Sequence, residues 1–363
     1  MRKLEDVIVY RDARYYATFP SVVARSDGEL LVAFRRAPER RRYFAPGVTH
    51  TDPNAQLVLV RSRDLGATWS SDPELIYAHP LGGSQDPCMV QLADGSLLTT
   101  SYAWMLLAQE ALAHGAHTWG PTYGQWHFTF LGGYLMRSLD AGCTWQGPVL
   151  PPHLAHQREY LPGVPVPAWN RGAIVQAGDG ALYWVVATDP IARPGVTMLD
   201  LLVSVDGGQC WEYRAPVAWD ERIAMNETSL VQTEAGDLVG FVRSENNDDH
   251  GLCVRSRDMG HTWEPWQDMG FQGHPFHGLR LSDGRILIVY GYRHPPFGVR
   301  ARLLDPDCRT FATEEVVLRA DGGSGDLGYP WACQTAEGRI LCVYYHNRED
   351  GTREIAGTFV ALD

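Results

Sequence analysis

The chain repeats one unit of about 60 residues six times, and this repeat limits the fold more than any other feature. Each unit places a short glycine-containing turn between two apolar runs that are rich in β-branched residues. The turn glycines are Gly28, Gly95, Gly180, Gly236, Gly284 and Gly338. Glycine supplies the positive φ of a tight hairpin, and a unit of this length holds four short strands. We therefore predict an all-β fold, a six-bladed β-propeller of four-stranded antiparallel blades.

Four units end in the pattern Ser-x-Asp-x-Gly followed by a tryptophan. The copies are Ser62–Trp69, Ser138–Trp145, Ser204–Trp211 and Ser256–Trp263, and a worn fifth copy ends at Phe311. At this spacing the aspartate accepts backbone N–H groups of its own turn, and the glycine relieves a strained position. We expect these aspartates to support the blades and to take no part in catalysis.

We predict a single propeller domain over residues 1–363 with a short insertion near 104–130. Within it, Trp104–His117 reads as a short helix or an ordered loop, and Trp119, Tyr123 and Trp126 form either a sugar-stacking wall or a packing layer. A strand at Val7–Tyr10 is expected to close the ring beside the last repeat, because the final strand would otherwise be an open edge.

The composition excludes several classes of partner. The net charge is −12, whereas a nucleic-acid binder needs a basic surface to contact phosphates. No apolar run approaches the ~18 residues of a membrane span, and the N-terminus has no signal-peptide pattern, so we expect a cytoplasmic protein without a membrane partner. The seven cysteines are scattered without a CxxC pair, and we expect neither a metal nor a cofactor.

Polar residues recur at one position of the repeat, nine residues before the turn glycine. The six residues there are Phe19, Asp86, Arg171, Glu227, Pro275 and Tyr329, of which four are charged or phenolic. The first strand of each propeller blade lines the central channel, so the ring brings these six positions to one axis. The sequence thus predicts one polar site at the centre.

The four Ser-x-Asp-x-Gly copies resemble the Asp-box of the sialidase superfamily, and the resemblance covers nearly the whole chain. It implies a sialidase-like propeller that acts on glycans, with Tyr329 as the nucleophile, activated by Glu227. A phenol has a pKa near 10, so it needs a carboxylate to take its proton. The resemblance makes Asp52 the general acid; Glu39 and His50 are the other proton donors of that loop.

The resemblance also implies three arginines that hold a sugar carboxylate. Arg243 matches the second, and Arg300 is our choice for the third, with Arg293 close behind. The first belongs to an Arg-Ile-Pro-like motif, where this chain has Thr18-Phe19-Pro20. An acidic sugar is then held differently, by Arg35, Arg36 or Arg171, or the substrate is another sugar. Asp86 would contact a substrate hydroxyl or amide.

Three functions follow from these residues. The first is an exo-acting, retaining glycoside hydrolase that removes sialic acid or a related acidic sugar from glycans. The second is a polysaccharide lyase for uronic acids, in which His274, His277, Tyr329 and Arg243 would remove a proton and neutralise a carboxylate. The third is a propeller that binds glycans without catalysis. We expect His274 and His277 to contact sugar or move protons rather than to hold a metal.

Overall fold

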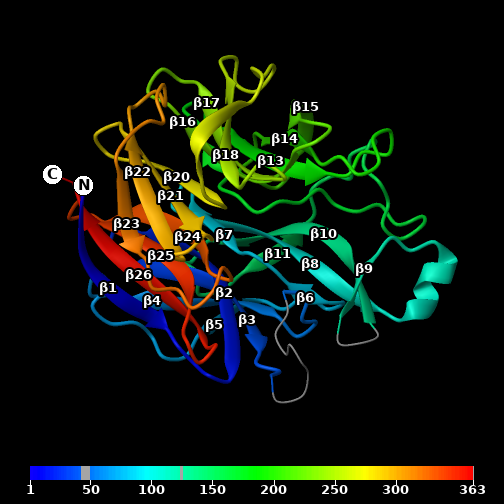
Figure 1. The fold of residues 1–363 in the computed structure, drawn as a ribbon, viewed down its shortest axis with the longest axis horizontal. Coiled ribbons are helices and arrows are strands. Elements are labelled where there is room, and N and C mark those ends of the chain that lie inside the picture. Colours follow the sequence, from blue (N-terminus) through cyan, green and yellow to red (C-terminus); the bar gives the residue numbers. More distant parts are fainter. Residues whose placement is uncertain (42–49, 123–125, 363) are drawn as a thin grey trace.

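The computed structural model describes residues 1–41, 50–122 and 126–362. Its strands form six antiparallel sheets arranged in a ring, which confirms the predicted six-bladed propeller (Figure 1). Each sheet has four strands, except the second, which has six because of short additional strands. We number the sheets as blades one to six in the order of their first strands.

The strand bounds follow the repeat. Blade one comprises β2 (Tyr15–Ala24), β3 (Leu30–Pro38), β4 (Gln56–Ser62) and β5 (Glu74–Tyr77). Blade two comprises β6 (Gly83–Ser84), β7 (Cys88–Gln91), β8 (Leu97–Leu107), β9 (Trp119–Thr122), β10 (Trp126–Ser138) and β11 (Gln146–Val149). Blade three comprises β12 (Val175–Gln176), β13 (Leu182–Thr188), β14 (Met198–Ser204) and β15 (Glu212–Trp219). Blade four comprises β16 (Ala224–Gln232), β17 (Leu238–Glu245), β18 (His250–Ser256) and β19 (Gln267–Gln272). Blade five comprises β20 (Phe276–Arg280), β21 (Ile286–Tyr292), β22 (Gly298–Leu304) and β23 (Glu315–Arg319). Blade six comprises β24 (Gly328–Gln334), β25 (Ile340–Asn347), β26 (Arg353–Ala361) and β1 (Arg2–Tyr10).

The two ends of the chain close the ring in blade six. Strand β1 pairs antiparallel with β26, and the register runs from Arg2 opposite Ala361 to Tyr10 opposite Ile355. This confirms the predicted closure, although the strand begins at Arg2 rather than at Val7. The outer edge of β26 is thereby covered, and the last blade obtains its fourth strand from the start of the chain.

The insertion in blade two is a long hairpin whose described part carries the 3₁₀ helix η1 (Gln109–His114). Aromatic rings pack it onto the blade: Trp104 stacks on Phe130 at 3.7 Å between ring centroids, and Trp119 meets Phe130 edge-on at 5.1 Å. Trp119 therefore belongs to a packing layer. Trp126 is 39% exposed, and Tyr123 lies outside the described residues.

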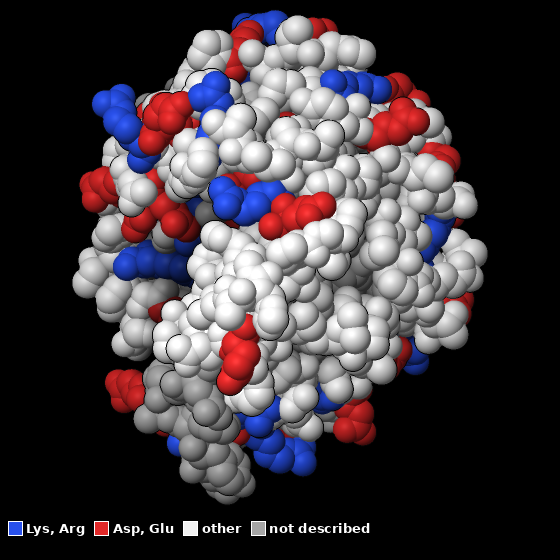
Figure 2. Space-filling view, turned by 90° about the vertical axis from the view of Figure 1, so that its right-hand side faces the viewer, with Lys and Arg blue, Asp and Glu red and all other residues white. Residues whose placement is uncertain are grey.

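The insertion side of the molecule carries few charges. Within residues 104–122 and 126–133 the one charged side chain is Glu110. Figure 2 faces this side, and its charged residues lie mainly near the edges of the view around a broad uncharged area. In the part of the chain that the structure describes, no helix is long and apolar enough to cross a membrane.

The Asp-box aspartates bond within their own turns, as their spacing predicts. In the first copy the Asp64 carboxylate accepts the backbone N–H of Thr68 at 2.8 Å and the hydroxyl of Ser62 at 2.8 Å. Ser62 Oγ in turn accepts the N–H of Gly66 at 2.8 Å. These hydrogen bonds, led by the one from the Thr68 hydroxyl, lower the pKa of Asp64 to about 2. Each box is thus a closed local unit at the rim of its blade.

Glutamines fasten neighbouring blades at the turn end of the inner strands. The side-chain oxygen of Gln176 in blade three accepts the N–H of Ala93 in blade two at 2.7 Å, and its amide donates to the carbonyl of Gly180 in its own turn at 3.3 Å. Gln232 accepts the N–H of Gly178 at 2.8 Å in the same way. Gln334 accepts the N–H of Ser282 at 2.9 Å. We call these contacts the glutamine clasps.

Candidate active site

The end of the channel opposite the clasps collects the polar residues, because three inner strands bulge there. The pairing of β2 with β3 shifts between Thr18 and Ser21, that of β16 with β17 between Met225 and Thr228, and that of β24 with β25 between Gly328 and Trp331. Each shift sets three residue steps on the inner strand against two on its partner. A bulge of one residue re-aims the side chains beside it.

Two of the bulges hold a bulky residue in the left-handed region. Phe19 has φ 56° and Tyr329 has φ 49°, and their rings meet at 4.6 Å between centroids. A residue with a Cβ held at such a φ costs about 1–3 kcal/mol, so the surrounding structure must impose it. The third bulge contains Glu227. The bulges thus explain why the side chains of Phe19, Glu227 and Tyr329 depart from the regular alternation of side chains along their strands.

A guanidinium joins the carboxylate and the phenol at the centre of the site. Arg243 Nη1 lies 2.9 Å from Glu227 Oε2 and 2.9 Å from the Tyr329 hydroxyl. Its Nη2 lies 2.9 Å from Glu245 Oε1. Arg243 ends up here because β17 continues to Glu245 alongside the bulged β16. Blades four and six are therefore connected through one buried cation.

Two further arginines face the ring of Tyr329. The guanidinium carbon of Arg171 lies 4.7 Å from the ring centroid and that of Arg293 lies 5.1 Å from it. Arg171 is 2% exposed and donates to the carbonyl of Pro330, whereas Arg293 donates to the carbonyl of Leu327. Arg171, Arg243 and Arg293 thus surround one phenol with three cations.

The charges set the protonation states of Glu227 and Tyr329. Burial raises the pKa of Glu227, but the attraction of Arg243 and Arg171 outweighs this, and the net pKa is lowered. Burial, reinforced by the charge of Glu227, raises the pKa of Tyr329 above its usual value, although Arg243 opposes this. At neutral pH the pair consists of a carboxylate and a neutral phenol, so the carboxylate is the base of the two.

Asp86 is a second carboxyl group in the same cluster. It lies in the gap between β6 and β7, is 2% exposed, and its Oδ1 has no hydrogen-bond partner within the described ranges. Burial, followed by repulsion from Glu227, raises the pKa of Asp86 to about 7, although Arg171 and Arg35 act against this. Asp86 therefore changes charge near neutral pH, whereas Glu227 stays ionised.

The structure places other predicted residues away from Tyr329. Arg300 is 3% exposed, donates to the carbonyl of Pro296 and faces Glu315 on the outer strand of blade five at 3.5 Å. The structure thus places Arg293, and not Arg300, beside the ring of Tyr329. Arg36 lies over the ring of Tyr15 at 4.4 Å.

Asp52 and Arg35 are also engaged within the protein. Asp52 is 2% exposed, and its carboxylate accepts Arg40 Nε at 2.5 Å and the N–H of Asn54 at 2.8 Å. Arg35 is fully buried, and its Nη2 donates to the carbonyl of His50 at 3.0 Å. Within the described residues, Arg35 thus holds the backbone of His50, and Asp52 binds Arg40 and Asn54.

The two histidines of blade five lie in different surroundings. His274 is near Arg243 and Arg293; burial first and these cations second lower the pKa of His274 to about 2. His277 lies on β20 and stacks on Trp331 at 4.1 Å, and its Nδ1 accepts the N–H of Ala332 at 3.2 Å. The lyase hypothesis requires His277 to lie with Tyr329 and Arg243. The structure places His277 away from them. Among the described residues, no group of three or more His, Cys, Asp or Glu could hold a metal.

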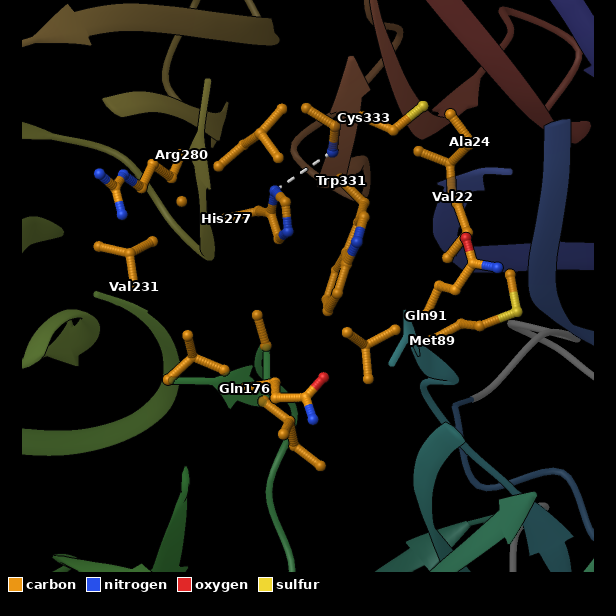
Figure 3. Close-up of a pocket in the computed structure, with 18 of the residues that line it drawn as sticks. Val22, Ala24, Met89, Gln91, Gln176, Val231, His277, Arg280, Trp331 and Cys333 are labelled. Atoms are coloured by element: carbon orange, nitrogen blue, oxygen red, sulfur yellow. Dashed lines mark hydrogen bonds between the residues drawn. The ribbon is translucent and has the colours of Figure 1, made fainter. Parts of the chain in front are cut away.

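A cavity of about 760 Å³ occupies the end of the channel where the glutamine clasps lie (Figure 3). Gln176, Gln232 and Gln334 line it together with apolar residues of the inner strands. Figure 3 shows His277 and Trp331 side by side within its lining. The cavity and the Tyr329 cluster thus lie at opposite ends of the inner strands, and we place the chemistry at the cluster because the ionisable groups converge there.

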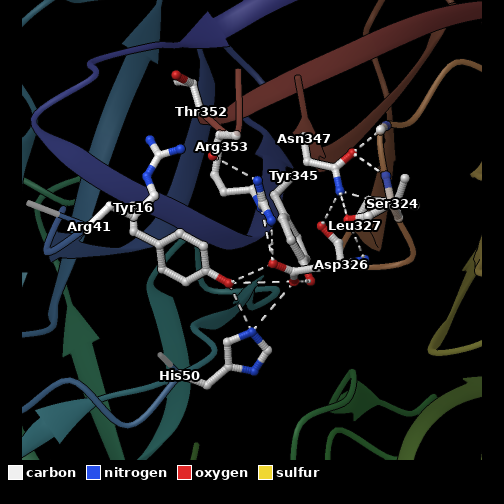
Figure 4. A network of polar contacts seen from close by, with 12 residues as sticks. Tyr16, Arg41, His50, Ser324, Asp326, Leu327, Tyr345, Asn347, Thr352 and Arg353 are labelled. Carbon is white, nitrogen blue, oxygen red and sulfur yellow. Dashed lines mark hydrogen bonds and ion pairs between the residues drawn. The ribbon is translucent and has the colours of Figure 1, made fainter. Parts of the chain in front are cut away.

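A second polar network adjoins Tyr329, and sequence reasoning missed most of it (Figure 4). Asp326 accepts the hydroxyls of Tyr345 at 2.8 Å and Tyr16 at 3.2 Å, and Arg353 donates to it at 2.8 Å. His50 Nε2 lies 2.9 Å from the Tyr16 hydroxyl and 3.6 Å from Asp326. Tyr16 and Asp326 each lie three residues before a bulged aromatic, Phe19 or Tyr329, and this shared offset was the available signal.

Comparisons with known proteins agree with this architecture. The model of the BNR repeat-like domain matches residues 111–342. A crystal structure of a protein of unknown function from Dyadobacter fermentans is 46% identical, with a TM-score of 0.94 over 100% of this chain and 99% of that one. No curated protein matches this sequence.

Solved sialidases share the fold at low identity. A mutant of the NanB sialidase from Streptococcus pneumoniae is 13% identical, with a TM-score of 0.68 over 98% of this chain and 70% of that one. The Trypanosoma rangeli sialidase in complex with the inhibitor DANA is 13% identical, with a TM-score of 0.62 over 99% of this chain and 58% of that one. The chain therefore belongs to the BNR repeat-like family, with the propeller fold of the sialidase superfamily.

Proposed function

We propose that this protein is an exo-acting, retaining glycoside hydrolase that uses Tyr329 as its nucleophile. The observation that carries the proposal is the position of Arg243 Nη1, 2.9 Å from both Glu227 and the Tyr329 hydroxyl, within a group that draws on three bulged or interrupted inner strands. A core tyrosine would need neither a buried carboxylate nor three surrounding cations. A nucleophilic phenol needs both a base and a stabilised anion.

The resting charges fit the first step of such a reaction. Tyr329 is protonated because its pKa is raised by burial, and Glu227 is ionised because Arg243 and Arg171 outweigh its burial. As the Tyr329 oxygen bonds to the anomeric carbon, its proton passes to Glu227. Arg243, in contact with both groups, stabilises the negative charge that develops on the oxygen before the bond is complete.

The cations favour an acidic sugar as the substrate. Arg243 and Arg293 both lie next to Tyr329 and are less deeply buried than Arg171, so their guanidinium groups are the ones that a sugar carboxylate can reach. Arg171 lies under the ring of Tyr329 with its Nη1 buried. We infer sialic acid or a related nonulosonic acid, bound by two arginines because Thr18 occupies the place of a third.

Trapping of the covalent intermediate tests this function directly. The Trypanosoma rangeli sialidase has been solved with 2,3-difluorosialic acid as a covalent intermediate. Incubation of this protein with that reagent should raise its intact mass by one fluorosialyl group and block turnover of 4-nitrophenyl sialoside. The Tyr329→Phe variant, with one oxygen removed, should gain no mass and lose turnover by orders of magnitude. Full activity in that variant would refute the proposal.

The two other functions make different predictions. A uronate lyase would release products that absorb in the unsaturated-uronate band. His277 could not take part in such a reaction at the Tyr329 cluster, because it is hydrogen-bonded to Ala332 outside the cluster. A binding propeller would retain glycan affinity in Tyr329→Phe and show no turnover in the unmodified protein. One panel of sialosides, nonulosonates and uronate polymers therefore distinguishes all three.

A further inference from the structure

The mechanism above needs a proton donor for the leaving oxygen, and the residue expected for it is poorly placed to act. Asp52 is 2% exposed, and its two carboxylate oxygens accept hydrogen bonds from Arg40 and from the N–H of Asn54. Both oxygens of this carboxylate are thus engaged by groups of the protein.

His50 belongs to the same loop and has the opposite character. Its ring meets Phe19 edge-on at 4.9 Å between centroids, and Phe19 in turn contacts the ring of Tyr329 at 4.6 Å. The His50 side chain is 46% exposed, so one part of the ring is accessible while the other faces the cluster. The ring of Phe19 thus lies between this imidazole and Tyr329, and part of the imidazole remains open to a ligand.

Other groups of the protein hold both the backbone carbonyl and the ring of His50. Its carbonyl oxygen accepts hydrogen bonds from Arg35, which is fully buried, and from Gln85, which is 1% exposed. Its Nε2 lies 2.9 Å from the Tyr16 hydroxyl and 3.6 Å from Asp326 (Figure 4). In the described ranges the structure gives no hydrogen-bond partner to Nδ1. One ring nitrogen is thus bound by the protein and the other is left for a substrate.

Asp326 has the properties of a group that orients this histidine. Arg353 donates to it twice, at 2.8 and 3.0 Å, and Tyr345 donates at 2.8 Å. These contacts hold the carboxylate beside Nε2. A carboxylate next to one nitrogen of an imidazole fixes the tautomer and favours the imidazolium.

We propose that His50 is the acid and base catalyst of this site and that Asp326 is its positioning residue. The inference rests on the proposed glycosidase function and deepens it, because it assigns the second proton transfer to a histidine on the loop instead of to Asp52.

The proton transfers balance over the two steps. When the anomeric carbon bonds to the Tyr329 oxygen, the phenolic proton moves to Glu227, and the bond from the anomeric carbon to the leaving oxygen breaks. The leaving oxygen takes a proton from Nδ1 of the His50 imidazolium. In the second step water attacks the anomeric carbon and gives a proton to Nδ1. The Tyr329 oxygen leaves and recovers its proton from Glu227, so the enzyme returns to its initial state.

Several charged and titratable groups act on His50. Asp326 favours its protonated form, whereas Arg35 and Arg293 disfavour it, and Tyr16 contacts its Nε2. Burial of the inner face is the largest effect, and the net pKa of His50 is below its usual value. The acid step should therefore be most efficient in mildly acidic solution and should weaken as the pH rises towards neutrality.

Leaving-group dependence tests the assignment. The full-length protein and its His50→Gln, Asp52→Asn, Asp86→Asn and Tyr329→Phe variants are assayed on methyl and 4-nitrophenyl sialosides. A methoxide leaving group needs protonation, whereas nitrophenolate leaves without it. For His50→Gln we expect kcat/KM to fall by about 10²–10⁴-fold on the methyl sialoside and by less than about tenfold on the nitrophenyl sialoside. His261→Gln, an exposed histidine in an Asp-box, is the matched control.

Each outcome decides the assignment. The same selective loss in Asp52→Asn or Asp86→Asn, with His50→Gln active on the methyl sialoside, would overturn the proposal and leave the glycosidase function intact. Equal loss on both substrates in His50→Gln would make it a structural residue. No turnover by the unmodified protein on any sialoside or nonulosonate would remove the proposed function and this inference together.

The role of Asp326 is tested by a measurement other than activity. The pKa of His50, followed by proton NMR of its ring, should fall in Asp326→Asn because an attracting carboxylate is replaced by an amide. The alkaline limb of the methyl sialoside profile, where the acid step weakens, should move to lower pH by the same amount. An unchanged His50 pKa would show that Asp326 does not position the ring.

Discussion

Replacement of Arg243 by methionine tests whether the cluster is an interdependent electrostatic unit. Arg243 and Glu227 have side chains that are 15% and 10% exposed, with 2.9 Å between Nη1 and Oε2. Methionine keeps most of the apolar stem of arginine and removes its charge. The variant therefore leaves a buried carboxylate without its principal partner.

The magnitude follows from the competing charges. Two unit charges 2.9 Å apart attract by about 6 kcal/mol at an effective dielectric constant of about 20. Arg171 continues to attract Glu227 in the variant, and repulsion between Arg243 and Arg293 disappears. Loss of one partner of a buried pair commonly costs about 3–5 kcal/mol. We expect the free energy of unfolding to fall by about 3 kcal/mol at pH 7, near the lower end of that range.

The effect should depend on pH with a definite sign. In the unmodified protein the pKa of Glu227 is below its usual value of 4.5, so the stability from its pairing is fully present above pH 4.5 and is lost as the pH falls through the folded pKa. Without Arg243, burial raises the pKa of Glu227, and the folded variant takes up a proton as the pH falls from 7 to 5. The difference in unfolding free energy should narrow over this range.

Urea denaturation at pH 7 and pH 5 measures both quantities, provided that the m values agree between proteins. The double variant Arg243→Met with Glu227→Gln provides the control, because a neutral amide needs no cation. We expect it to be more stable than Arg243→Met alone by at least about 2 kcal/mol. A loss below about 1 kcal/mol, or equal stability of the single and double variants, would refute the reasoning.

Two other predictions concern the pH profile and the backbone. Because the pKa of Asp86 is raised to about 7, its ionisation adds a charge beside Glu227, and kcat/KM for 4-nitrophenyl sialoside should fall above pH 7. Asp86→Asn should remove this alkaline limb; an unchanged limb would assign it to another group. A Cβ at Gly172 would lie 1.7 Å from the Thr228 carbonyl oxygen, so Gly172→Ala should displace blade three from blade four and lower the melting temperature by many degrees. Gly178→Ala, whose Cβ would meet its first neighbour at 3.6 Å, is the control and should melt like the unmodified protein.

The sequence predicted the inner strands well because turn chemistry determines their register. Gly236 and Gly338 fix the turns of two hairpins. The position nine residues before each glycine is Glu227 or Tyr329, and this position does not depend on how the outer strands pair. The closing strand at the N-terminus was predicted by a different argument, the open edge that the final strand would otherwise leave. Five of the six positions that counting placed near the axis lie in one cluster, namely Phe19, Asp86, Arg171, Glu227 and Tyr329.

Side chains on the second and third strands were harder to predict. Arg243 and Arg300 both follow apolar runs, yet Arg243 contacts Tyr329 while Arg300 faces Glu315. The difference depends on the pairing of each strand with its neighbours, which local patterns do not encode. His50 meets Asp326 across 276 positions of the chain through the path of a loop, and no periodicity specifies that path.

The glutamine clasps have a consequence for the geometry of the Tyr329 cluster. Gln176, Gln232 and Gln334 each lie five residues after one site residue, namely Arg171, Glu227 and Tyr329. Five residues of extended chain span about 17 Å, so each inner segment is a lever with a clasp at one end and an ionisable group at the other. A tilt of the strand by about 3° at the clasp would displace the ionisable group at its other end by about 1 Å, which is enough to break a hydrogen bond. The alignment of Tyr329, Glu227 and the arginines is thus set in part at the far end of the inner strands.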